Sequence, residues 1–137
     1  MPNLPPQLQA GIKALFPVLV EWAEKMEARA LTEGVPLGDH LKNTAKVLGI
    51  RQPDAVRVLV VQTIPEPDNR RIVELSARFG LSFIGSAGIM FGPAIFVLGS
   101  FANDQRVLTH ELVHVRQYET AENIEAYPRV YVRQIFV

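Results

Sequence analysis

The sequence predicts a single α+β domain, and three patterns indicate this fold class. The first is a helical periodicity over residues 7–33, where apolar residues recur three and four positions apart. The second is a set of apolar runs at 55–64 and 88–98 that are typical of buried strands. The third is a capped, amphipathic helix over 103–119. We therefore expect the 137 residues to form one domain in which helices enclose a small sheet.

The N-terminal part, residues 1–50, is predicted to be helical. Pro17 lies inside the periodic segment 7–33, so we expect either a kink or two helices that meet there. A second helix is predicted over 38–48, because its apolar residues share one side and Gly49 is a natural helix end.

Residues 55–137 are expected to hold the sheet and the remaining helices. The β-branched run 55–64 predicts a buried strand. A Pro-rich loop follows, in which Asp68 is the candidate N-cap of a short helix over 69–79. Two further strands, 89–91 and 94–98, are joined by a Gly-Pro turn.

Two helices are predicted to complete the domain. The helix over 103–119 begins with Asn103 or Asp104 as its cap. A last helix over 122–135 ends in an apolar tip, and apolar ends of this kind usually pack on another surface. This C-terminal helix is therefore a candidate surface for homo-oligomerisation.

Composition excludes several classes of protein. With 48% hydrophobic residues the chain can form a core, and its net charge of zero argues against a nucleic-acid-binding protein. Cysteine is absent, so any metal must be bound by His, carboxylate and water. The N-terminus lacks the pattern of a signal peptide, which makes the cytoplasm the expected location.

Residues 79–102 carry no charge and are long enough to span a bilayer. They also contain several glycines and Pro93, which divide the segment into short pieces. We therefore expect two strands of a sheet, and a membrane-embedded protease is the alternative.

The segment that carries chemistry is His110-Glu111-Leu112-Val113-His114, an HExxH motif within the predicted helix 103–119. Residues four apart lie on one side of a helix, so His110 and His114 can reach one zinc ion. Glu111 is then placed to accept a proton from zinc-activated water as the general base. The motif predicts a metallopeptidase, with exposed helix histidines as the structural alternative.

The sequence from His110 to Glu119 resembles the active helix of zincin metallopeptidases, and most closely small bacterial gluzincin-like domains with an HELxHxxQ motif. The resemblance implies a zincin-like fold, in which helices surround a small mixed sheet and an edge strand precedes the active helix. It also implies Zn²⁺ as cofactor, His110 and His114 as ligands, and Glu111 as the catalytic residue. The segment from Gly88 to Leu98 would then lie along the substrate cleft.

The third zinc ligand departs from the family pattern. Thr120 stands where metzincins have a histidine, and Gln134 stands near the position where gluzincins often have a glutamate. The remaining acidic candidates after the motif are Glu119, Glu122 and Glu125. We favour Glu125, which needs a chain reversal near 120–123 to reach the metal.

Other metal sites and functions stay open at this stage. Asp39 and His40 are outside candidates for the third ligand, and a site with two histidines and no third protein ligand is an equal alternative. The leading function is a zinc-dependent metallopeptidase that acts on a peptide or protein substrate. The runner-up is an inactive interaction or oligomerisation domain of zincin fold with an incomplete metal site.

Overall fold

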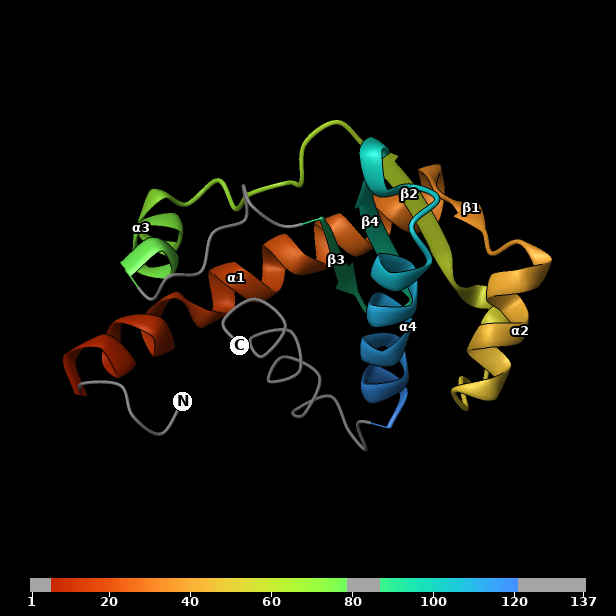
Figure 1. The fold of residues 1–137 in the computed structure, drawn as a ribbon. Helices are drawn as coiled ribbons and strands as arrows, with labels where there is room; N and C mark the ends of the chain where they lie inside the picture. Colours follow the sequence, from red (N-terminus) through yellow and green to blue (C-terminus); the bar gives the residue numbers. More distant parts are fainter. Residues whose placement is uncertain (1–5, 79–86, 121–137) are drawn as a thin grey trace.

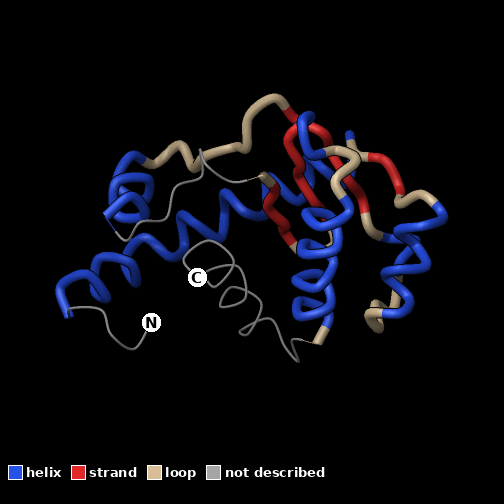
Figure 2. The backbone as a smooth tube through the Cα atoms, viewed as in Figure 1, coloured by secondary structure: helices blue, strands red, loops and turns tan. Residues whose placement is uncertain are grey.

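The computed structural model describes residues 6–78 and 87–120, and Figure 1 shows their arrangement. A four-stranded sheet lies between two helical layers (Figures 1 and 2). The long helix α1 (Pro6–Glu33) covers one face, and α3 (Arg70–Arg78) packs beside α1, with Ile72 in the same core. Helices α2 (Asp39–Val47) and α4 (Gln105–Glu119) cover the other face. The predicted α+β class with a small mixed sheet is confirmed.

The sheet has the strand order β1-β2-β4-β3. Strands β2 (Arg57–Val61) and β4 (Ala94–Leu98) are parallel, whereas β1 (Val35–Pro36) and β3 (Gly88–Phe91) pair antiparallel to their neighbours. The crossover from β2 to β4 includes α3, as parallel strands require a long connection. The strand order makes β3 an edge strand of the sheet within the described chain. Along the sequence, β3 is followed by β4 and then by α4.

Strands β3 and β4 form the tight hairpin that the Gly-Pro pair predicted. Phe91 pairs with Ala94 across a two-residue turn, and Gly92 adopts a φ of +60°, which a residue with a side chain rarely takes. A Cβ atom on Gly92 would also lie 2.9 Å from Oε1 of Glu27 on α1. The turn thus needs glycine for its backbone angle, while the end of the flexible Glu27 side chain could move to make room.

The two faces of the hairpin enter two separate cores. Phe91 and Phe96 face α1, where the Phe91 ring meets the edge of Trp22 at a centroid distance of 5.2 Å. Met90 and Ile95 face the opposite side and pack with Leu112 and other residues of α2 and α4. Burial on both faces explains why residues 88–98 read as a nearly continuous apolar run.

The structure corrects three expectations about element boundaries. Helix α1 continues through Pro17 as one helix, so the alternative of two helices that meet there is wrong. The cap of α3 is Asn69, not Asp68, because the Asn69 Oδ1 accepts hydrogen bonds from the backbone N–H groups of Arg71 and Ile72 at 3.0 and 3.3 Å. The two-residue strand β1 was not predicted, since a strand that short has no periodicity to detect.

The buried strand predicted over 55–64 is shorter in the structure, where β2 covers Arg57–Val61 and is only partly buried. The other predicted elements agree with the structure or lie outside it. Strands at 89–91 and 94–98 and helices at 38–48 and 103–119 are confirmed within a residue or two. In the ranges that the structure describes, no helix combines the length and apolar character needed to cross a membrane. The predicted helix over 122–135 lies outside the described residues.

Candidate metal centre

The candidate site is built on α4, whose start is fixed by its N-cap. Oδ1 of Asp104 accepts hydrogen bonds from the backbone N–H groups of Arg106 at 2.9 Å and Val107 at 3.3 Å. One side of the helix then packs on the sheet and on α2 through four buried residues: Leu108, Glu111, Leu112 and Val115. This packing fixes the rotation of α4 about its axis, and so determines which of its side chains lie on the side away from the sheet and α2.

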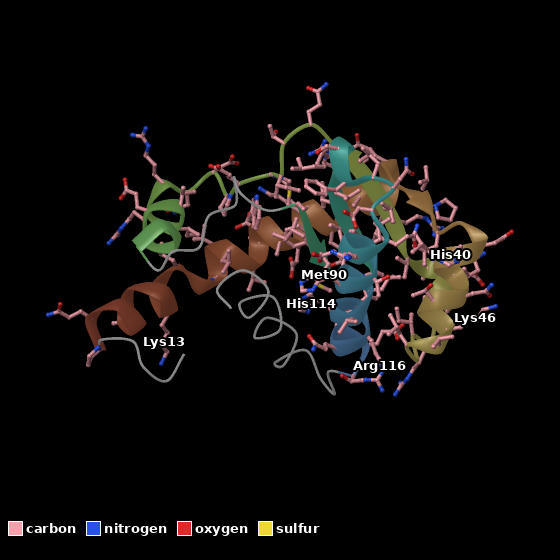
Figure 3. The ribbon with its side chains drawn as sticks, viewed as in Figure 1. Lys13, His40, Lys46, Met90, His114 and Arg116 are labelled. Atoms are coloured by element: carbon pink, nitrogen blue, oxygen red, sulfur yellow. The ribbon has the colours of Figure 1, made fainter. Side chains whose placement is uncertain are left out.

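His110 and His114 converge from the side of α4 that faces away from α2 (Figure 3 labels His114). Their Nε2 atoms are 3.1 Å apart and the rings are nearly perpendicular, at 88°. Two nitrogen ligands of a tetrahedral zinc ion, each at about 2.0–2.1 Å, lie about 3.3 Å apart. The observed separation therefore fits two ligands of one zinc ion with a shift of only tenths of an ångström.

Gln117 orients the second histidine. Nδ1 of His114 donates a hydrogen bond to Oε1 of Gln117 at 3.0 Å. In the neutral ring this leaves the lone pair on Nε2, the atom that faces His110. Burial and the nearby His114 lower the pKa of His110, which favours the neutral ring that a metal requires.

Glu111 projects from α4 toward the edge strand β3 and is 5% exposed. Within the described chain its carboxyl group has no hydrogen-bond partner and no ion pair, and burial raises its pKa to about 7. Gly88 of β3 lies against this side chain: a Cβ atom there would be in ordinary contact with Cγ of Glu111, at 3.4 Å, and would lie closer, at 3.1 Å, to the carbonyl oxygen of Phe96 on β4.

A hollow of about 410 Å³ opens beside this group. Its lining comes from the start of β3 and from the first half of α4: Ala87, Gly88, Arg106, Val107, His110 and Glu111. The sequence had placed the segment that begins at Gly88 along the cleft, but it did not point to Ala87, Arg106 or Val107. Arg106 had a detectable signal, since it lies four residues before His110 and so shares the histidine stripe of the helix.

The structure does not bring a third ligand to the two histidines within the described ranges. Glu119 is engaged elsewhere, because its carboxylate accepts hydrogen bonds from the backbone N–H groups of Arg51 and Gln52 at 2.7 and 3.2 Å. It is therefore wrong as a ligand candidate. His40 and Asp39 lie on α2, and Figure 3 shows His40 apart from His114.

Glu125 and Glu122 lie outside the described residues. Over residues 6–78 and 87–120, no cluster of three or more His, Asp or Glu side chains could hold a metal ion. Comparisons of the chain with family models, with curated proteins and with solved structures gave no match.

Proposed function

We propose that this protein is a zinc-dependent metallopeptidase whose ligands include His110 and His114 and whose general base is Glu111. The observation that carries the proposal is the convergence of the two Nε2 atoms at 3.1 Å beside a buried carboxyl group that faces an open hollow. A zinc ion bound there would supply Lewis-acid polarisation of the scissile carbonyl and would acidify a water molecule.

Side chains of this protein would bind the metal, orient a ligand and transfer the proton. His110 and His114 bind through Nε2, and Gln117 holds the His114 ring in the required tautomer through the 3.0 Å hydrogen bond at Nδ1. The Glu111 carboxylate accepts a proton from the attacking water and returns it to the leaving amine nitrogen. Burial raises the pKa of Glu111 to about 7, and a zinc ion bound beside it would favour the charged carboxylate, which is the form that accepts the proton.

Glu125 remains the third ligand that we propose, with Glu122 as the alternative, and a two-histidine site is the competing arrangement. Zinc titration of Glu122→Ala and Glu125→Ala distinguishes them. If neither substitution weakens binding, the third ligand does not come from this segment. Completion of the site by a partner copy then becomes the better explanation.

The experiment that tests the proposal measures zinc affinity and hydrolysis of a quenched fluorescent peptide library by the purified chain. His110→Ala and His114→Ala should each abolish stoichiometric zinc binding, while His40→Ala, the matched control on α2, should leave it unchanged. Glu111→Gln should retain zinc and lose about 10²- to 10⁴-fold in rate. Zinc binding that survives both site substitutions, or turnover unchanged in Glu111→Gln, would contradict the proposal.

A further inference from the structure

The hollow beside the histidines contains a cation that the proposed chemistry does not use. Arg106 lines the hollow together with His110 and Glu111, and its side chain is exposed. In the described ranges of the chain, no carboxylate forms an ion pair with its guanidinium group. Asp104, the nearest acidic residue in sequence, directs its Oδ1 to backbone N–H groups at the start of α4.

The position of Arg106 along α4 relates it directly to the metal ligands. Arg106, His110 and His114 are spaced four residues apart, so they form one stripe on the helix surface. Four residues of helix advance about 6 Å along the axis. Arg106 therefore lies one turn before the ligand pair, at the same hollow.

We propose that Arg106 is a specificity-determining residue that binds a carboxylate of the peptide substrate close to the scissile bond. The inference rests on the proposed peptidase function and adds the chemical class of substrate. A guanidinium group presents paired N–H donors that match the two oxygens of a carboxylate. Peptides offer that group either as an Asp or Glu side chain or as the C-terminal carboxylate.

The spacing limits where that carboxylate lies in the substrate. An extended peptide advances about 3.3 Å per residue, so an offset of one helical turn corresponds to about two residues. The carboxylate recognised by Arg106 is thus expected within two residues of the bond that is cut. A basic or neutral side chain at this position gains no ion pair there.

The test uses binding as well as turnover, so that it does not depend on hydrolysis. Zinc-loaded Glu111→Gln protein is titrated with fluorescein-labelled hexapeptides that carry one Glu, moved through an alanine background, and with matched Gln peptides. A second arm compares free and amidated C-termini, which separates a side-chain carboxylate from a terminal one. Binding is measured by fluorescence anisotropy.

We expect one Glu peptide, or the free C-terminus, to bind about fivefold to tenfold more tightly than its neutral counterpart, the range of a well-oriented but exposed ion pair. Adding Arg106→Gln should remove the preference, and Arg106→Glu should shift it to the matched Lys peptide. Arg116→Gln is the control, because Arg116 is an exposed arginine on the same helix that lies against Gly49, away from the hollow.

The outcomes separate this inference from the proposed function. Equal binding of acidic and neutral peptides, no measurable binding of either, or a preference that survives Arg106→Gln would each overturn the role of Arg106. A preference that Arg106→Gln removes, in a parent protein that hydrolyses no peptide, would support the carboxylate site and reject the peptidase. Hydrolysis of peptides without a preference for acidic ones would support the peptidase and reject the carboxylate site at Arg106.

Discussion

The two halves of α4 each hold a glutamate that is turned toward the body of the protein, and the two carboxyl groups have opposite environments. Glu119, in the last turn, accepts two backbone hydrogen bonds from residues 51 and 52 and so ties the segment after α2 to the helix. Glu111, two turns earlier, is more deeply buried and has no such donor in the described chain.

This difference is the one expected between a structural carboxylate and the general base that we propose. Backbone N–H donors stabilise the charged form of a carboxylate and occupy its lone pairs. Burial without donors destabilises the charged form, because the carboxylate loses hydration and forms no hydrogen bonds that replace it. A group of the second kind lowers stability, and proteins retain such groups mostly at functional sites. The four predictions below test this contrast.

The largest stability effect is expected for Glu111→Gln in EDTA-treated protein. Burial raises the pKa of Glu111 from its ordinary value of 4.5 to about 7. The folded protein therefore favours the protonated form of Glu111. As pH rises from 4.5 to 7 the unfolded chain loses this proton first, so the free energy of unfolding of the parent falls. Gln carries no charge, so the variant should gain up to about 3 kcal/mol over the parent by pH 8.

Urea denaturation at pH 5 and pH 8 measures this gain. The difference in unfolding free energy between variant and parent should be larger at pH 8 than at pH 5. A constant difference at both pH values would show that Glu111 is well solvated or paired, and the contrast with Glu119 would fail.

Gln117→Ala should weaken zinc binding about 10- to 100-fold, because the hydrogen bond that holds the His114 ring is lost. Gln117→Glu is the conservative control: a carboxylate can accept the same hydrogen bond from Nδ1, so affinity should largely recover. Competition with a chromophoric chelator gives both values. Equal zinc affinity in Gln117→Ala and the parent would mean that the packing of α4 alone orients His114.

Glu119→Gln should lower stability, in contrast to the gain at Glu111. The neutral amide retains one acceptor oxygen, so one of the backbone donors of residues 51 and 52 keeps an uncharged acceptor and the other loses its acceptor altogether. Hydrogen bonds to charged groups contribute about 1.5–3 kcal/mol, and partial exposure of this site places the expected loss near 1 kcal/mol. Thermal unfolding monitored by circular dichroism measures it, and an unchanged melting temperature would remove the structural role.

The smallest effect is expected for Asp54→Asn in the same segment after α2. The ion pair with Lys42, at 2.9 Å, lowers the pKa of Asp54 below its ordinary 3.8. Its contribution is present above pH 3.8 and is lost as pH falls through the lowered value. Since the carboxylate is exposed, the melting temperature at pH 7 should change less than in Glu119→Gln. A larger change would make this surface ion pair, rather than Glu119, the main tie between the segment and the domain.

Local patterns were sufficient for much of the fold and for the geometry of α4. The cap at Asp104, the helix that follows it and the four-residue spacing of the histidines all depend on residues within a few positions of one another. The Gly-Pro turn between β3 and β4 is equally local. Such features are determined by short-range hydrogen bonds and sterics, which the sequence displays directly.

Predictions that depend on contacts between residues far apart in the sequence were less successful. The sequence left Glu119 as a candidate ligand, because nothing near it in the chain reveals that residues 51 and 52 donate to it. The strand β1 exists only because it pairs with β2, and the parallel pairing of β2 with β4 depends on the crossover through α3. No local pattern encodes these contacts.

The sequence by itself determined that one helix presents His110 and His114 on a single stripe, with Glu111 beside them, since helix geometry converts spacing into direction. Only the tertiary structure decided that the Glu111 carboxyl group is buried and has a raised pKa. Strand β3 packs against α4 at Gly88 and this contact helps to bury the Glu111 side chain, while the far end of the same helix gives Glu119 its backbone hydrogen bonds. Desolvation depends on what packs against a residue, and that is set by segments distant in the chain.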